Sequence, residues 1–179
     1  RMSYLIKDLL DYARLSANND LVTRVDLNEI LQSVLIDFEV VIQQKQAIVK
    51  AGQLPVIEAI RLQMNQLFYN LISNSLKFGK KGQKLELSIT SEPLSQDELK
   101  LYPSLRSTNH YVRLVFADNG IGFSQQYAEQ IFTVFQRLND KSLYGGYGIG
   151  LALCRKVVEN HGGIIYASGI ENLGATFYV

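Results

Sequence analysis

The sequence predicts an α+β fold, specifically a two-layer α/β sandwich. Helical and strand-like hydrophobic patterns both occur along the chain, and they do not follow the strict alternation of βαβ units. The 179 residues, 47% of them hydrophobic, suffice for one domain with a short surplus. A chain of this length can bury a core without disulfides or a structural metal.

Charge and cysteine content exclude several classes of protein. The 18 Lys and Arg nearly balance the 17 Asp and Glu, which argues against broad electrostatic binding of nucleic acid or anionic lipid. The single cysteine, Cys154, excludes an intramolecular disulfide, and His110 and His161 lack the spacing of metal ligands. We expect a reducing, cytoplasmic setting, with membrane anchoring of the full-length protein left open.

The N-terminal third reads as two helices followed by short strands. Apolar residues recur with a helical period over residues 1–17, and a polar linker follows. A second helix is predicted from Leu27 to residue 44, with Asp26 and Glu29 forming a capping box. Short strands are predicted at residues 47–50 and 56–57.

The remaining two thirds mix helices with strands. Helices are predicted at residues 62–78 and 150–160, and an exposed excursion at residues 91–110. Strands are predicted at residues 85–90, 111–116, 164–167 and 176–179.

The helix at residues 62–78 carries the first candidate site. Asn70, Asn74 and Lys77 stand at i, i+4 and i+7, which places them on one helix face. Amide oxygens are ligands that Mg²⁺ accepts, and an ammonium group offsets phosphate charge. The alternative is a solvated helix face, although asparagine is a poor helix former.

Two glycine-containing segments follow. In the first, Asp118 ends a strand, so its carboxylate could accept hydrogen bonds from an amino group, while Gly120 and Gly122 permit close backbone approach. In the second, alternate glycines at Gly148 and Gly150 expose backbone amides at a helix start, which suits phosphate. The alternatives are an ordinary hairpin turn and a flexible hinge, respectively.

Four segments together resemble a known family. Residues 66–78, 118–123, 131–138 and 146–151 are similar, in that order, to the N, G1, F and G2 boxes of the catalytic ATP-binding domain of sensor histidine kinases. The likeness extends from about residue 25 to the end. It implies the Bergerat ATP-binding fold, an α/β sandwich that holds the nucleotide between helices and sheet, under a mobile lid at residues 124–144.

The resemblance implies ATP and Mg²⁺ as cofactors and assigns roles to residues. Asn74 would bind Mg²⁺, Asn70 would support metal and phosphates, and Lys77 would contact phosphate. Phe78 would pack on adenine, and Asp118 would accept from the adenine amino group. The remaining cofactor-binding residues would be Gly120 and Gly122 at the adenine pocket, Gly146, Gly148, Gly150 and Leu151 around the triphosphate, and Phe132 and Phe135 as anchors of the lid.

One residue type separates phosphotransfer from hydrolysis. In related ATP-hydrolysing proteins the resemblance places a glutamate base where this chain has Asn70. An amide cannot take a proton from water at neutral pH, so transfer to a protein side chain is favoured. Asn70, Asn74 and Lys77 are therefore the predicted catalytic residues.

The resemblance also divides the chain. Residues 1–20 would be the second helix of the dimerisation hairpin with its linker, and residues 21–179 the catalytic domain. The phosphoacceptor histidine would lie on the first helix, which this chain lacks. His110 and His161 do not fit that role, and His161, at a helix end, is predicted to cap or pack. We expect a fragment that binds ATP without phosphorylating itself.

The predicted function is a protein histidine kinase domain that passes the ATP γ-phosphate to the dimerisation hairpin of the same or partner subunit. The phosphate would then go to the receiver domain of a response regulator, within a homodimer and without nucleic acid. Two departures from the family pattern are Tyr147, in place of a small hydroxyl residue, and residues 59–61, which lack the usual acidic residue and proline and so weaken the helix cap. The alternatives are a degenerate nucleotide-binding module and a serine-directed kinase of the same fold.

Overall fold

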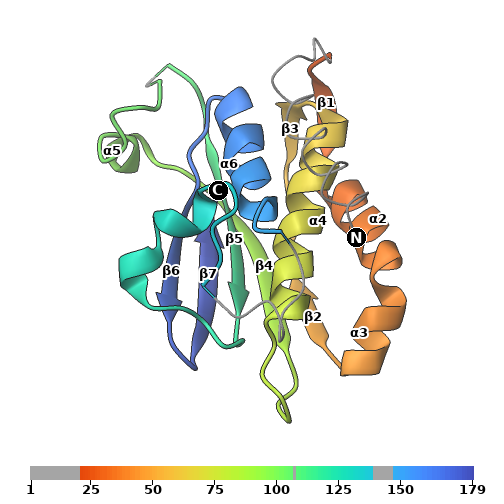
Figure 1. Cartoon of the computed structure of the whole chain (residues 1–179). Coiled ribbons are helices and arrows are strands. Elements are labelled where there is room, and N and C mark those ends of the chain that lie inside the picture. The colour runs from red at the N-terminus through yellow and green to blue at the C-terminus, as the bar shows by residue number, and fades with distance from the viewer. Residues whose placement is uncertain (1–20, 107, 139–146) are drawn as a thin grey trace.

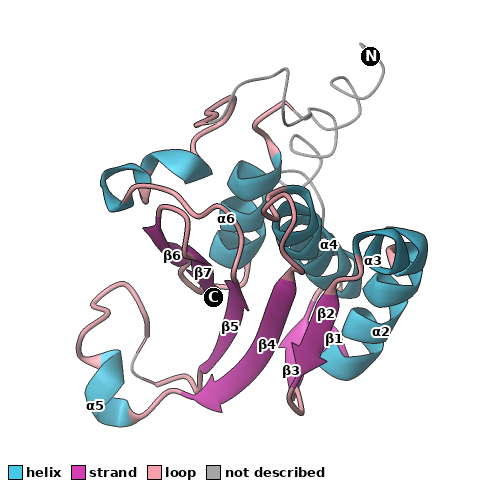
Figure 2. Cartoon of the chain, turned by 90° about the horizontal axis from the view of Figure 1, so that it is seen from below, coloured by secondary structure: helices cyan, strands magenta, loops and turns pink. Residues whose placement is uncertain are grey.

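The computed structural model describes residues 21–106, 108–138 and 147–179. The predicted helix at residues 1–17 and its linker lie outside the described residues, and so does Gly146. A five-stranded sheet is covered on one face by helices, as Figures 1 and 2 show. This arrangement confirms the predicted α+β two-layer sandwich.

The strands are β1 (Thr23–Asp26), β2 (Ile48–Ala51), β3 (Val56–Ala59), β4 (Glu86–Pro93), β5 (Val112–Asp118), β6 (Tyr166–Ile170) and β7 (Gly174–Tyr178). The helices are α2 (Leu27–Asp37), α3 (Glu39–Lys45), α4 (Arg61–Lys77), α5 (Gln96–Leu99) and α6 (Gly150–Asn160), and short 3-10 turns form at Gln125–Tyr127 and Gln130–Phe132. The helices predicted at residues 62–78 and 150–160 are confirmed as α4 and α6.

The large sheet has the strand order β2-β4-β5-β7-β6. Only the β2–β4 pair in it is parallel, among the described residues, and the chain between these strands passes through β3 and α4. A parallel pair needs such a crossover, which places α4 on one face of the sheet. The chain therefore brings the end of α4 beside the end of β5, where the candidate residues lie.

The region before α4 differs from the prediction in two places. Thr23–Asp26 forms strand β1, which pairs antiparallel with β3 to make a separate two-stranded sheet. The predicted continuous helix to residue 44 is wrong, because α2 ends at Asp37 and α3 starts at Glu39. Between them, Phe38 leaves helical geometry and packs its ring 4.7 Å from that of Tyr69 on α4.

The predicted capping box at the start of α2 is half present. The Asp26 carboxylate accepts a hydrogen bond from the Asn28 backbone N–H at 2.8 Å, as an N-cap should. The Glu29 carboxylate pairs with Arg61 at 3.0 Å. Glu29 thus ties α2 to the first turn of α4.

The core lies between the helices and the sheet. The apolar face predicted for α4 is buried, and Phe68 meets Phe116 of β5 edge to face with ring centroids 5.2 Å apart. Alternate residues of β5, Leu114 and Phe116, face this core, and Asp118 continues the same face. The strand period therefore directs the Asp118 side chain toward α4.

The excursion after β4 is mostly exposed, as predicted, and a few contacts anchor it to the sheet. It contains α5, which starts with a complete capping box between Ser95 and Glu98. The Tyr102 and Tyr166 hydroxyl oxygens lie 3.1 Å apart, and Arg113 of β5 bonds Glu98 at 3.2 Å. These contacts join the excursion to strands β5 and β6.

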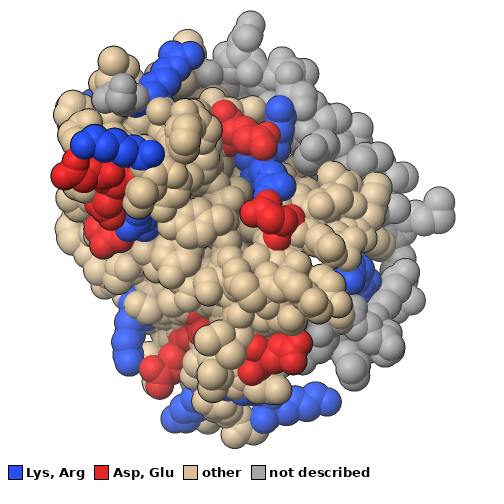
Figure 3. All heavy atoms as spheres, turned by 90° about the vertical axis from the view of Figure 1, so that its left-hand side faces the viewer, with Lys and Arg blue, Asp and Glu red and all other residues tan. Residues whose placement is uncertain are grey.

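Figure 3 shows one face of the molecule on which Lys and Arg lie among Asp and Glu, with uncharged residues between them. This face has no broad field of one sign, in agreement with the near-zero net charge. Among the described residues, no helix combines the length and apolar character needed to cross a bilayer.

Candidate functional site

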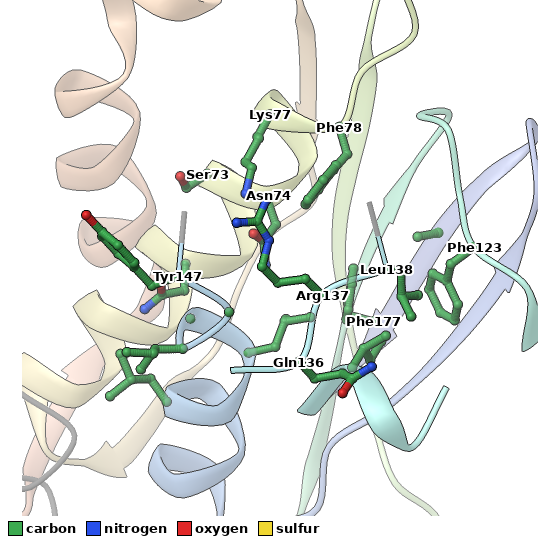
Figure 4. A pocket seen from close by; sticks show the side chains of 18 of the residues that line it. Ser73, Asn74, Lys77, Phe78, Phe123, Gln136, Arg137, Leu138, Tyr147 and Phe177 are labelled. Atoms are coloured by element: carbon green, nitrogen blue, oxygen red, sulfur yellow. The ribbon is translucent and has the colours of Figure 1, made fainter. Parts of the chain in front are cut away.

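A cavity of about 420 Å³ lies between α4, the end of β5, residues 136–138 and the start of α6. This volume falls within the roughly 300–1,000 Å³ of small-molecule sites. Figure 4 shows side chains from these elements converging on it. Nine of the predicted site residues line it: Asn70, Asn74, Lys77, Phe78, Asp118, Gly122, Gly148, Gly150 and Leu151.

We call the region of Asp118, Ser75, Gly120 and Gly122 the Asp118 end of the cavity. The Asp118 carboxylate accepts from the Ser75 hydroxyl at 2.9 Å and from the Gly120 backbone N–H at 2.9 Å. A third, longer bond of 3.4 Å comes from the Ala175 backbone N–H. Burial raises the pKa of Asp118, and these hydrogen bonds oppose the rise. The carboxylate is thus fixed in direction and partly desolvated.

Two glycines at this end leave no room for a side chain. A Cβ at Gly122, whose φ is 61°, would lie 2.0 Å from the Ile170 carbonyl oxygen. A Cβ at Gly120 would lie 2.6 Å from the Phe78 carbonyl oxygen, which accepts the Ile121 N–H at 2.9 Å. Gly120 does not line the cavity, but its close approach holds the loop after β5 against the end of α4.

We call the region of Asn70, Asn74, Lys77 and Arg137 the Lys77 end. Burial, and then the nearby Arg137 guanidinium, lower the pKa of Lys77. Figure 4 shows both cations reaching the same part of the cavity beside Asn74. The Lys77 ammonium also lies 4.5 Å from the centre of the Phe78 ring. Two cations in one cavity favour an anionic ligand there.

Asn70 contacts the start of α6. Its side-chain NH₂ donates to the Gln66 carbonyl of its own helix at 2.8 Å, which leaves the amide oxygen as its free end. A Cβ at Gly150 would lie 2.8 Å from that oxygen. A side chain at position 150 would therefore require the Asn70 amide to move from its present position.

The predicted lid anchors fall into different environments. Phe132 is buried, meets Phe177 edge to face and lies under the Arg155 guanidinium at 4.8 Å. Phe135 is 58% exposed, does not line the cavity and has a φ of 65°. Its backbone N–H donates to the Gly148 carbonyl at 2.9 Å. The structure thus places Phe132 in the core and Phe135 at the surface.

Sequence reasoning missed several residues of the site. Ser75 holds Asp118, Arg137 faces Lys77, and Ser73 lines the cavity beside Asn74. Arg137 belongs to the segment that resembles the F box, so its charge was a usable signal. Tyr147, which was singled out, lines the cavity next to Gly148.

The amide oxygens at the Lys77 end could bind a hard metal ion only if a bound ligand supplied further oxygen atoms. Among the described residues, no group of three His, Cys, Asp or Glu side chains could hold a metal. The amide oxygens of Asn70 and Asn74 are neutral, hard donors of the kind Mg²⁺ accepts when phosphate and water supply the other positions. The residues present therefore fit Mg²⁺ bound together with a phosphate ligand.

Comparison with known proteins identifies the family of this chain. Residues 59–179 match the model of a family described as histidine kinase-, DNA gyrase B- and HSP90-like ATPase. Over 99% of its length the chain is 34% identical to phytochrome-like protein Cph1 of Synechocystis sp. and 36% identical to cyanobacterial phytochrome B of Nostoc sp.. It spans 22% of the length of each. It is also 30% identical, over 99% of the chain, to adaptive-response sensory kinase SasA of Synechococcus sp., of which it spans 45%.

Solved structures show the same fold. The catalytic domain of histidine kinase ThkA aligns with a TM-score of 0.65 and 26% identity over 87% of this chain and 93% of that one. Full-length ShkA in complex with AMPPNP aligns with a TM-score of 0.74 over 98% of this chain and 34% of that one, at 24% identity. ThkA in complex with response regulator protein TrrA aligns with a TM-score of 0.69 and 25% identity, over 99% of this chain and 46% of that one.

Proposed function

Because the chain belongs to the histidine kinase-, DNA gyrase B- and HSP90-like ATPase family, we propose that it is the ATP-binding catalytic part of a sensor histidine kinase. Residues 21–179 would form the catalytic domain, and residues 1–20 would belong to the dimerisation hairpin with its linker. The proposal draws on relatives named as sensory kinases and on the likeness to the ThkA catalytic domain. The single observation that carries it is the cavity, with one half-buried carboxylate at one end and amides with cations at the other.

The Asp118 end is suited to adenine. An ionised carboxylate only accepts hydrogen bonds, and the adenine amino group donates where guanine presents a carbonyl oxygen. Because Asp118 is held by Ser75 and Gly120, its carboxylate would meet adenine without first reorganising. Phe78 and Gly122 line the same region and would contact the flat base.

The Lys77 end would hold the triphosphate. Lys77 and Arg137 would offset its negative charge, and the backbone at Gly148 and Gly150 lies at the start of α6, where amides favour anions. Asn74 and Asn70 would hold Mg²⁺ through their amide oxygens. When bound, the metal supplies charge neutralisation and orients the phosphates for in-line transfer.

Chemistry at this site would favour transfer over hydrolysis. Asn70 cannot accept a proton from water, so it supplies no base for hydrolytic attack. An imidazole nitrogen of the acceptor histidine, on the other helix of the hairpin, would attack the γ-phosphorus. The bond to the bridging oxygen would break, ADP would leave, and the phosphoryl group would pass on to a response regulator. We place this activity in the cytoplasm and in a homodimer of the full-length protein.

The first test measures nucleotide binding by calorimetry. We expect the 179-residue chain to bind Mg-ATP and to prefer it over Mg-GTP. Asp118→Asn should weaken ATP binding by roughly tenfold or more, since it replaces a charged acceptor in a partly desolvated site by a neutral amide. Asp97→Asn is the matched control, because Asp97 is exposed and pairs with Lys100. No ATP binding, or equal binding by the Asp118 variant, would contradict the proposal.

The second part of this test measures phosphotransfer. A separate fragment that contains the complete helical hairpin with its histidine is mixed with the chain and ATP labelled at the γ-phosphate. Label should appear on the added hairpin and on neither His110 nor His161. Tight ATP binding without any transfer would instead indicate a nucleotide-binding module, and label on His110 or His161 would refute the absence of an acceptor in this chain.

A further inference from the structure

Helices α4 and α6 lie side by side and antiparallel, as Figure 1 shows. Near the cavity, Gly150 approaches the Asn70 amide oxygen. Further along, the Cys154 sulfur lies 4.0 Å from the Leu67 carbonyl oxygen. At the far end, the Asn160 amide donates to the buried Gln63 side chain at 3.3 Å. The two helices therefore touch along a continuous line that ends inside the candidate site.

The far end of this line is closed by His161, the C-cap residue of α6. Its Nε2 accepts the Ile60 backbone N–H at 3.0 Å. Its Nδ1 lies 2.7 Å from the Val157 carbonyl oxygen, to which it must donate because Nε2 is the acceptor. Both ring nitrogens are thus engaged, one with each helix. We call His161, Ile60 and the Asn160–Gln63 pair the clasp.

The start of α4 needs a partner from elsewhere. Its N-cap is Ile60, no side chain caps it, and no acidic residue stands in its first turn. An apolar N-cap supplies no side-chain acceptor for the first amides of a helix, and so it is less stabilising than Asp or Ser. His161 supplies an acceptor from a residue 101 positions away. Capping α4 therefore also fixes α6 to it.

We propose that His161 is a positioning residue for the nucleotide site, because the clasp sets the position of α6 along α4. This inference rests on the proposed function. Asn70 follows Ile60 by ten positions, a span of about 15 Å along a rigid helix. A shift of α6 by one residue would move its start by about 1.5 Å, well beyond the roughly 0.5 Å that a functional site tolerates. The clasp would hold the Gly148 and Gly150 backbone opposite Asn70 and Asn74.

A substitution that caps α4 from its own N-cap position can distinguish two roles of His161, positioning of α6 and simple capping of α4. The Ile60 backbone, with φ of −88° and ψ of 108°, is compatible with aspartate at an N-cap. Ile60→Asp would supply a side-chain acceptor for the Leu62 or Gln63 backbone N–H, which stabilises α4 without any contribution from α6. His161→Phe would remove both ring hydrogen bonds and keep a flat ring. The double variant is therefore capped but has lost the bond between the helices.

The experiment compares the 179-residue chain with both single variants and the double variant. Urea unfolding gives the stability, and calorimetry under conditions where each protein is folded gives the Kd for Mg-ATP. We expect His161→Phe to lower the unfolding midpoint and the double variant to recover it. The Kd should stay raised, by roughly three- to tenfold, in the double variant. Exposed His110 offers the matched control, His110→Phe, which should change neither quantity.

The Kd of the double variant decides the inference. A raised Kd in a protein of restored stability supports positioning, whereas a return to the unmodified Kd would overturn it, because His161 would then act only as a cap. If His161→Phe alone does not fold, the double variant still carries the test. A failure of the unmodified chain to bind ATP would overturn the proposed function and this inference with it.

Discussion

At the Asp118 end of the cavity, one carboxylate is met by three hydrogen-bond donors, whereas at the Lys77 end two cations approach each other. The first end is built from a strand terminus and glycine loops packed backbone to backbone. The second is built from one helix face and the loop that carries Arg137.

This difference separates what the fold provides from what the ligand must provide. The Asp118 end has its hydrogen-bond partners within the protein, so it is organised before any ligand binds. At the Lys77 end, burial and like charge both disfavour the ammonium form of Lys77. An anionic ligand would relieve that cost. The first end is therefore organised by the protein itself, whereas the charge balance of the second end would be completed by the ligand.

The largest expected effect comes from a pair of glycines, one at each end, that both have positive φ. At Gly122 a Cβ would lie 2.0 Å from the Ile170 carbonyl oxygen and 2.6 Å from that of Gly174, both in the hydrogen-bonded β6–β7 hairpin. At Gly148 it would lie 2.6 Å from the Gln136 carbonyl oxygen, in a loop. Gly122→Ala should cost about 3 kcal/mol or more of unfolding free energy, and Gly148→Ala about 1–2 kcal/mol.

Urea unfolding of the two variants measures this contrast. Gly82→Ala is the control for positive φ alone, because its φ is 75° and a Cβ there meets nothing within 4 Å. Equal losses of unfolding free energy in Gly122→Ala and Gly148→Ala would show that the two ends of the cavity are equally rigid. That result would contradict the difference described between them.

A second pair of variants tests hydrogen bonding on one helix. Ser75 is buried and donates to Asp118 at 2.9 Å, while Ser73 lines the cavity and is half-buried. Ser75→Ala should cost about 1–2 kcal/mol, since it leaves a half-buried carboxylate oxygen with one donor fewer. Ser73→Ala should cost less than about 0.5 kcal/mol. Thermal or urea unfolding of both variants gives the comparison, and a larger loss for Ser73→Ala would contradict the assigned roles.

The helix that carries the site could be predicted closely from the sequence, since local patterns determine it. The apolar period of α4 places Asn70, Asn74 and Lys77 on one face, and the glycines before α6 mark its start. All three polar residues line the cavity. Their chemical roles remain predictions, because position alone does not establish them.

Features that depend on distant partners could not be predicted in this way. Strand β1 has four residues and its partner β3 lies beyond two helices, so the local pattern did not reveal it. Ser75 contacts Asp118 across 43 residues, and nothing in its neighbourhood sets it apart from Ser73. The cap or packing role predicted for His161 is confirmed, but its partner Ile60 appears only once α4 and α6 are placed together.

The smallest expected effect is a pH dependence at the Asp118 end. Burial raises the pKa of Asp118 in the folded protein above its ordinary range near 4. The folded state therefore holds this proton more tightly than the unfolded state, so the stabilising contribution is present below about pH 4 and is lost as pH rises through the raised pKa. Unfolding measured from pH 4 to 7 should show the unmodified chain losing stability relative to Asp118→Asn.

Nucleotide affinity should move in the opposite direction over the same range. The adenine amino group needs an acceptor, and the protonated carboxyl is a poorer one, so ATP binding should weaken as pH falls through the raised pKa of Asp118. Asp118→Asn, which does not titrate, should lack this component of both profiles. If the stability and the ATP affinity of the unmodified chain instead both rise with pH, the fold stabilises the ionised form of Asp118. That outcome would contradict the raised pKa and the partial desolvation assigned to this carboxylate.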